Sequence, residues 1–406
     1  MKIGFMVLSV LIMCAGAYAQ VTEQQVIDGA MAGPQVISAR MEYEAADAYS
    51  HKDRFLPNPM ISIEYMNVAD TTLNFTESME KEVAITQSVP FPVKLFFKAG
   101  AGSDSAKMKK ASYEQALRKT KAAARTAYVK FYRAQMELKF AREYADTLKQ
   151  ISVLESSGYK GGMDPLMSAS EADIEYALAV QSAQEAEQSV FTAAAGIYKI
   201  TGNTINPPAD ESAEPPEITP LTGTAGDYVK AALLNSAELK MAEAEKNMAL
   251  NMRAAAFLDY LPDLNITYKK SFAPGNKNYS VMLMAEIPIW FLNNQQAMIG
   301  SQGALYDAKE KSYEEMKNGV ELEVKSLYSA ALNEHRAINL YDGVLIPKAQ
   351  VRVKAAAAAR KSGAGSFKGL LEAQKMLLMM QRDHLMHIEG YVMNYAMLLS
   401  MCDEYK

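Results

Sequence analysis

The chain has 406 residues, a formal net charge of −5 and no block of basic residues, which argues against nucleic acid as a partner. Alanine, lysine, glutamate, methionine and leucine dominate, a composition typical of long helices. The two cysteines are Cys14 and Cys402. Loss of an N-terminal segment would leave only Cys402, which excludes an intrachain disulfide and a cysteine-based metal site.

Residues 1–19 have the pattern of a secretory signal peptide. Lys2 is followed by a short apolar run at 3–13, and Ala17-Tyr18-Ala19 forms a cleavage site before Gln20. Cleavage before a lipid-modified Cys14 is an alternative, although the bulky residue preceding it argues against this. No later stretch approaches the roughly 20 apolar residues that a membrane-spanning helix needs. The sequence therefore predicts an exported chain without a membrane helix.

In chain order, a first helix is expected over 22–54 and is ended by two prolines. Residues 59–67 and about 80–89 alternate with period two, and they predict a strand pair joined by a polar loop at 69–79. These two strands define a first β-hairpin at 59–89.

A long helical segment follows. Residues 99–155 contain no proline, and a helix of that span would be roughly 85 Å long. Glycines at 158–162 predict a tight reversal, and Asp164-Pro165 starts a returning helix that reaches about residue 200. Residues 203–222 are rich in proline and acidic residues, and they predict an extended linker.

The second half of the chain repeats this plan. Matched points lie 203 (Pro59 to Pro262), 198 (Pro90 to Pro288) and 204 (Leu166 to Leu370) residues apart, which indicates an internal duplication. The expected elements are a helix at 226–256, strands at 263–272 and 279–288, a long helix at 294–361, a turn at Gly363 and Gly365, and a helix at 366–402. The predicted domains are a first repeat at 20–202 with a helical hairpin at 99–200, the linker, a second repeat at 223–402 with a β-hairpin at 263–288 and a helical hairpin at 294–402, and a tail at 403–406.

The strand count points to an assembly of several copies. Four strands leave two open edges, which cannot lie in a hydrocarbon layer, and a membrane barrel needs at least about eight strands. Three copies would supply twelve. The candidates for a lipid-facing side are Ile61, Ile63, Tyr65, Leu264, Ile266, Tyr268, Leu283 and Ile287. The alternative is a small soluble sheet that buries these residues in an ordinary core.

Taken together, these features resemble the TolC-type outer-membrane efflux family. The resemblance rests on the signal, the duplicated unit, the X-Pro steps Val89-Pro90-Phe91 and Ile287-Pro288-Ile289, and Leu345-Ile346-Pro347 in the long helix. It also rests on the turn from Arg360-Lys361-Ser362-Gly363 to Leu370-Leu371-Glu372-Ala373. In the first turn, whether Gly158 or Gly161 matches the family's glycine stays open.

The resemblance implies a mostly α protein with a small β part. Three copies would form a twelve-stranded outer-membrane barrel on a long periplasmic α-helical barrel. Such a homotrimer would be the passive exit duct of a tripartite efflux pump or a type I secretion system, in the envelope of a Gram-negative type of cell. Its partners would be a periplasmic adaptor protein, an inner-membrane transporter and outer-membrane lipid. The residues expected at the periplasmic tip, for adaptor contact or gating, are Gly158, Tyr159, Lys160, Gly161, Asp164, Lys361, Gly363, Gly365 and Phe367.

Individual residues in these segments have two interpretations. Asp164 could form a charged ring after trimerisation, or it could simply stabilise its helix N-terminus. Tyr159, Lys160 and Phe367 are expected to be exposed in their turns. Trp290 fits an aromatic residue at a membrane interface.

No motif in the sequence indicates an enzyme, a cofactor or a complete metal site. His384 and His387 lie one helical turn apart among methionines such as Met380 and Met386, and thioethers suit Cu(I). A copper- or silver-specific duct is therefore an alternative, but methionine also fills irregular seams between packed helices. A further alternative is a soluble periplasmic coiled-coil structural or adaptor protein.

Overall fold

The computed structural model describes residues 21–66, 80–161, 165–208, 213–272, 278–287, 291 and 293–402. Most of these residues are helical, and the strands form one antiparallel sheet, as the sequence predicts. The chain divides into two compact units. The sheet unit comprises Ala32–Ala122, Leu221–Leu332 and Asn394–Lys406, and the hairpin unit comprises Met1–Met31, Ala123–Pro220 and Asn333–Met393.

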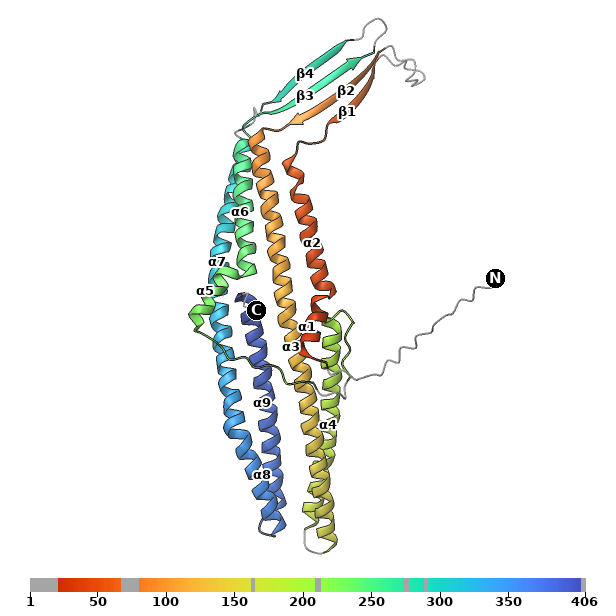
Figure 1. Ribbon diagram of the computed structural model, residues 1–406, viewed down its shortest axis with the longest axis vertical. Helices are drawn as coiled ribbons and strands as arrows, with labels where there is room; N and C mark the ends of the chain where they lie inside the picture. The colour runs from red at the N-terminus through yellow and green to blue at the C-terminus, as the bar shows by residue number, and fades with distance from the viewer. Residues whose placement is uncertain are drawn as a thin grey trace, which may run out of the picture. The chain divides into compact units, whose positions relative to one another are not determined.

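The sheet contains strands from both halves of the chain (Figure 1). In the described residues its strand order is β1-β2-β3-β4, and all three pairings are antiparallel. The central pairing of β2 with β3 joins the first half of the chain to the second. The strands are β1 (Met60–Met66), β2 (Glu80–Val89), β3 (Asp263–Ser271) and β4 (Tyr279–Glu286).

Several helices complete the sheet unit. Buried side chains of α5, α7 and α9 form one helical core in this unit, and the Cys402 thiol donates to the carbonyl oxygen of Tyr228 at 3.4 Å. The core residues are Tyr228, Val229, Ala232, Val320, Val324, Leu398 and Cys402. The helices are α2 (Pro34–Ser50), the 3-10 turn η1 (Lys52–Arg54), part of α3 (Pro92–Lys160), α5 (Ala225–Asn235), α6 (Ala237–Leu258), most of α7 (Asn294–Leu340) and the end of α9 (Phe367–Cys402).

Two helices that the sequence predicts as continuous are interrupted. The helix expected over 22–54 breaks between α1 (Glu23–Met31) and α2, because Pro34 cannot continue a helix and instead occupies the first turn of the next one. The helix expected over 226–256 breaks at Ser236, whose Oγ accepts the Leu239 N–H at 3.3 Å and so caps α6.

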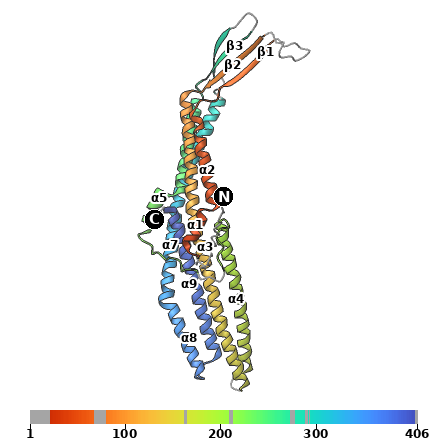
Figure 2. The ribbon, with the colours of Figure 1, turned by 45° about the vertical axis from the view of Figure 1, so that its right-hand side comes forward.

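The hairpin unit is built from two pairs of antiparallel helices. In both views α4 lies beside α3, and α8 lies beside α9 (Figures 1 and 2). Alanines recur in the cores of this unit, and their small side chains allow close helix packing. The unit contains α1, α4 (Leu166–Ile200), the π-helical turn η3 (Tyr341–Leu345), α8 (Ile346–Lys361) and the adjoining parts of α3, α7 and α9.

The second long helix also differs from its prediction as one helix over 294–361. Pro347 lacks the N–H that would continue the helical hydrogen-bond pattern, and it lies in the first turn of α8. Before it, the Ile346 N–H donates to the carbonyl oxygen of Tyr341, five residues back, which makes η3 a π-helical turn. The helical path is therefore kept across the proline by locally widening the helix.

The predicted linker is extended but firmly attached. The Tyr128 hydroxyl donates to the carbonyl oxygen of Glu214 at 2.9 Å, and the Ala213 N–H donates to Oε1 of Gln135 at 2.7 Å. Burial and the nearby charges of Glu214 and Glu23 raise the pKa of Tyr128 to about 12. This segment is therefore fastened to α3 within the hairpin unit.

Candidate functional sites

One face of the sheet is largely apolar and exposed, although Lys81, Gln87 and Lys270 also lie on it. Ile61 lies opposite Ile85, Ile85 opposite Tyr268, and Tyr268 opposite Val281, so one row of apolar side chains crosses all four strands. The eight residues predicted as lipid-facing lie along this alternation, and their exposed fractions run from 36% for Tyr65 to 69% for Ile287. Ile85 and Val281 lie on the same face but are not among those eight residues. Each is two residues from another apolar residue, Val83 or Leu283, and this spacing is the signal in the sequence that could have identified them.

The other face of the same sheet is largely polar. The hydroxyls of Thr86 and Thr267 lie 2.9 Å apart across the central pairing. Nearby, Lys269 Nζ lies 3.5 Å from a carboxylate oxygen of Glu82. Met282 and Met284 of β4 are apolar exceptions on this face. The sheet therefore presents largely apolar side chains on one face and largely polar side chains on the other.

The sheet has two open edges. Among the described residues, β1 pairs only with β2, and β4 pairs only with β3. The outer backbone groups of β1 and β4 are thus available for pairing with another strand.

A buried lysine fastens the base of the sheet. Lys94, 4% exposed, donates to the carbonyl oxygen of Leu261 at 2.8 Å and to Oδ1 of Asp263 at 2.9 Å. The same carboxylate oxygen accepts the Phe91 N–H at 2.9 Å. These bonds tie the start of α3 to the start of β3, so that the sheet and its helices keep a fixed junction.

The first helical turn differs from the sequence interpretation. Gly158, Tyr159 and Lys160 were expected to form the reversal, but they lie in the last turn of α3, and Gly158 is buried. The reversal starts at Gly161, whose N–H donates to the carbonyl oxygen of Ser157 at 3.0 Å. The helix can continue through Gly158 because no proline follows until Pro165.

The second helical turn is closed by two glycines. Gly363 has φ of +77°, and its N–H donates to the carbonyl oxygen of Arg360 at 3.2 Å. The N–H of the next residue reaches the carbonyl oxygen of Ala359 at 3.0 Å, which completes a Schellman cap. At Gly365 a Cβ would approach the backbone of Ala359 and Arg360 to 3.0 Å, so only glycine fits. Lys361, at the end of α8, is exposed.

Phe367 is not exposed, contrary to the sequence expectation. Its side chain is 5% exposed and packs in a core with Leu148 and Ile151 of α3 and Leu370 and Leu371 of α9. Phe367 is the first residue of α9, and the helix places its ring among these apolar partners. The sequence pattern placed Phe367 in an exposed turn and therefore could not anticipate this burial. By contrast, Met167 at the start of α4 is 77% exposed.

Polar contacts join the two helical hairpins inside the hairpin unit. Arg360 donates from Nε and Nη2 to Oε1 of Glu155 at 2.9 and 2.6 Å, and the Glu155 side chain is 1% exposed. Lys375 Nζ lies 2.7 Å from Oε1 of Glu175. Burial and the charge of Glu175 raise the pKa of Tyr144, on α3, to about 12. The hairpins are therefore held together by a buried ion pair as well as by an apolar core.

The described residues include no group of three or more His, Cys, Asp or Glu side chains that could hold a metal ion. His384 and His387 instead face carboxylates one at a time, at Asp342 and Glu334. Asp164, Trp290, Cys14, the signal at 1–19, the 69–79 loop and the 403–406 tail lie outside the described residues. In the part of the chain that the structure describes, no helix is both long enough and apolar enough to cross a membrane.

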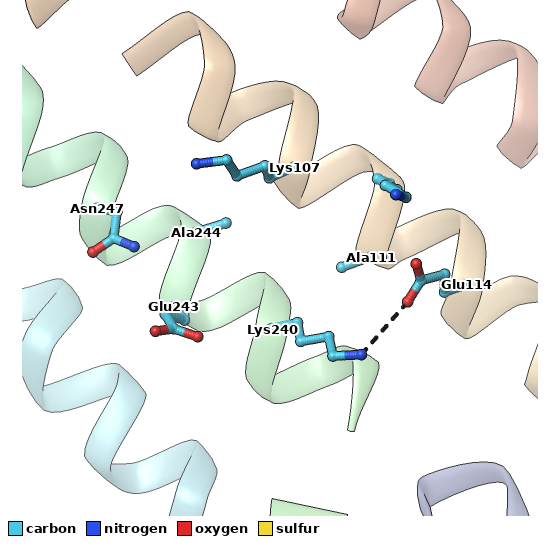
Figure 3. A pocket seen from close by; sticks show the side chains of 8 residues that line it. Lys107, Ala111, Glu114, Lys240, Glu243, Ala244 and Asn247 are labelled. Carbon is cyan, nitrogen blue, oxygen red and sulfur yellow. Dashed lines mark ion pairs between the residues drawn. The ribbon is translucent and has the colours of Figure 1, made fainter. Parts of the chain in front are cut away.

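A groove of about 260 Å³ lies between α3 and α6 in the sheet unit (Figure 3). Its lining combines two alanines with charged side chains of both signs, and Lys240 and Glu114 lie 3.9 Å apart. Opposite charges in a shallow, solvent-facing groove select no particular ligand. Its lining residues are Lys107, Lys110, Ala111, Glu114, Lys240, Glu243, Ala244 and Asn247.

Comparison with known proteins supports the resemblance derived from the sequence. Residues 32–203 match the family described as outer membrane efflux protein. No curated protein sequence matches the chain.

Solved structures share the fold over nearly the whole chain at low sequence identity. The outer membrane protein VceC of Vibrio cholerae is 15% identical, with a TM-score of 0.79 and coverage of 94% of this chain and 95% of VceC. The open state of the MtrE outer-membrane channel of Neisseria gonorrhoeae is 14% identical, with a TM-score of 0.80 and coverage of 95% and 89%. CusC, described in terms of folding and transmembrane channel formation, is 15% identical, with a TM-score of 0.79 and coverage of 94% and 92%.

These findings confirm the predicted resemblance to the TolC-type family. Residues 32–203 match the outer membrane efflux protein family, and the chain has the fold of the outer-membrane efflux channels.

Proposed function

We propose that this chain is the outer-membrane exit duct of a tripartite efflux pump or a type I secretion system. Three copies form a passive channel whose twelve-stranded barrel lies in the outer membrane, and whose helices form a tunnel in the periplasm. The duct carries out no reaction and needs no cofactor. Energy comes from an inner-membrane transporter, which a periplasmic adaptor protein connects to the duct.

The sheet is the observation that carries this proposal. Its apolar face is exposed in the single chain, which is unfavourable in water at roughly 25 cal/mol per Å² of apolar surface. Its two edges are open, and unmade backbone hydrogen bonds cost several kcal/mol each in hydrocarbon. Pairing β4 of one copy with β1 of the next removes the edges and places the apolar faces against lipid. Four strands per copy then supply twelve, an even number above the minimum of about eight.

The two helical turns are the proposed contact surface for the adaptor. Tyr159 is 45% exposed at the end of α3, and Lys160, Gly161 and Lys361 are exposed as well. Gly363 and Gly365 shape the second turn. Asp164 remains a predicted member of this surface. Phe367 supports it from the core and does not itself contact a partner.

Cross-linking between strand edges tests the assembly. Ser62 on β1 and Ser280 on β4 lie in the same row on the polar face of the sheet. Within one copy, three strand spacings separate them by about 14 Å, whereas paired neighbouring strands are about 5 Å apart. In the Ser62→Cys/Ser280→Cys variant, a bis-maleimide of about 8 Å reach should therefore link different copies only.

The expected product is a ladder that ends at three linked chains, and the purified protein should form ion channels in planar bilayers. Each single variant is the matched control and should give no chain longer than a dimer. The remaining Cys402 is buried and should not react. A protein that stays monomeric and forms no channels would favour the alternative of a soluble periplasmic structural or adaptor protein.

A further inference from the structure

Three of the chain's four histidines lie close together where α9 packs on the end of α7 and on η3. His384 and His387 are on one side of α9. We define the imidazole clasp as these two rings with Glu334 of α7 and with Tyr341 and Asp342 of η3. All five residues lie within the hairpin unit.

Each ring faces its own carboxylate. His387 Nδ1 lies 2.6 Å from Oε2 of Glu334, with both side chains about one-third exposed or less. His384 Nε2 lies 3.1 Å from Oδ1 of Asp342, although the two groups are not aligned as a hydrogen bond. The His384 contact is therefore mainly electrostatic and is strongest when the ring carries a charge.

Tyr341 lies beside both rings. Its ring centroid lies 5.1 Å from that of His387 and 6.4 Å from that of His384, and its hydroxyl is 3.3 Å from Oδ2 of Asp383. One turn beyond His387, a Cβ at Gly390 would come within 3.1 Å of Glu334, so glycine gives that carboxylate its room.

Acidic side chains lie around the two rings. Glu334 and Asp342 face them from α7 and η3, and Asp383 lies beside His384 on α9. The neighbouring cations are engaged elsewhere: Arg382 donates to Ser182 of α4 at 3.1 Å, and Arg133 of α3 lies 2.8 Å from Glu389. The remaining imidazole, His335, lies 3.4 Å from the Asn339 amide and stacks near Tyr391.

We propose that the clasp is a pH-dependent contact between α9 and the π-helical turn, which we call the fastening. When both imidazoles are charged they complement Glu334 and Asp342, and α9 is held on η3. When they are neutral, the charge attraction to Glu334 and Asp342 is lost, and the contact weakens. Histidine ordinarily changes charge between pH 5 and 8. The fastening is therefore present at the acid end of this range and is lost as the pH rises through it.

The π-helical turn is the element on which the fastening acts. Its five-residue hydrogen bond is less favourable than the helical pattern on either side, and such turns recur at functional sites. On the proposed function, loosening α9 from η3 at higher pH lets the second helical hairpin bend at this turn and alters the width of the tunnel. The fastening itself does not depend on that function.

Hydrogen exchange of the full chain at pH 5.5 and 7.5, corrected for intrinsic rates, tests the clasp. Amides of 334–345 and 380–391 should be about three- to tenfold more protected at pH 5.5 than at pH 7.5. In the His384→Gln/His387→Gln variant this difference should vanish. His335→Gln is the matched control from the same helix contact and should keep the difference.

Equal pH dependence in the wild type and the double variant, or no dependence in the wild type, would overturn the proposal. Should the double variant be unfolded, Asp342→Asn provides the same test, because its carboxylate is largely exposed and its loss should halve the effect or more. Channel measurements in the same pH range report separately on the duct. A folded clasp with normal pH dependence in a protein without channels would contradict only the proposed function.

Discussion

The sheet and the helical hairpins use apolar side chains in opposite ways. In the sheet, Ile61, Val281 and Leu283 are each about two-thirds exposed. In the hairpin unit, Tyr128, Phe131 and similar side chains are almost fully buried against alanines of neighbouring helices. The hairpins thus form apolar cores within one chain, although Ile174, Phe191 and Val351 stay exposed on their surface, whereas the apolar face of the sheet has no covering at all within the described residues.

This difference indicates where the protein needs other molecules. An exposed apolar face beside open strand edges needs an apolar medium and further strands. Each helical hairpin already buries an apolar core within the chain, so its folding depends mainly on contacts inside that chain. Substitutions should therefore act on folding in the hairpins and on membrane assembly in the sheet.

The largest effect is expected for Phe367→Ala. Removing a buried aromatic side chain leaves a cavity beside Leu148 and Ile151, and the free energy of unfolding should fall by about 3–5 kcal/mol. Denaturant unfolding of the full chain measures this. Met167→Ala at the start of the other returning helix is the control, and because Met167 is exposed its effect should stay within about 0.5 kcal/mol. Equal effects would remove the contrast between the two turns.

Arg360→Leu should be nearly as damaging. It leaves the Glu155 carboxylate buried without its cation, and the expected loss of stability is about 3 kcal/mol. Adding Glu155→Leu should recover much of this loss, because no buried charge then remains. Lys375→Ala is the control, since that pair is half exposed on the lysine side and should contribute below about 1 kcal/mol. If the double variant is no more stable than Arg360→Leu, the buried pair is not the cause.

Ile85→Lys should act on membrane assembly. A lysine on the lipid-facing side of a barrel strand costs about 2–4 kcal/mol near the middle of the bilayer. The fraction of chain recovered as trimer in the outer-membrane fraction should fall accordingly. Ser62→Lys on the polar face of the neighbouring strand should leave that fraction nearly unchanged. A larger loss for Ser62→Lys would mean that the faces are assigned the wrong way round.

The smallest effect concerns the break between α5 and α6. Ser236→Ala removes the hydroxyl that accepts the Leu239 N–H, and stability should fall by about 1 kcal/mol. Thermal unfolding measures it. Ser189→Ala, in the interior of α4, has an exposed side chain and should change stability by less than about 0.5 kcal/mol.

Some elements followed directly from local pattern, and others did not. The four strands begin and end within about two residues of their predicted bounds, because period-two alternation and flanking prolines are local signals. The break at Pro34 was also a local signal, but the surrounding helical pattern concealed it. The cap at Ser236 could be found only by asking which residue accepts the first N–H groups of α6.

The candidate sites divide in the same manner. The apolar face of the sheet could be predicted from alternation, because a residue's face depends only on its place in the strand. The burial of Phe367 could not, because it depends on α3 and α4 lying against the start of α9. The clasp could be anticipated only in part. The spacing of His384 and His387 shows in the sequence, but Glu334 lies 53 residues before His387 on α7, and Asp342 lies in η3.

The sequence by itself determined the duplicated order of helices and strands, the polarity of each sheet face and the likeness to outer-membrane efflux proteins, because these depend on periodicity and spacing along the chain. Only the tertiary structure decided that β2 pairs with β3, that Glu155 meets Arg360 and that Phe367 is a core residue. Those facts rest on contacts between segments far apart in the chain. The local sequence pattern is compatible with several arrangements of these segments, and burial and charge pairing decide which of them forms.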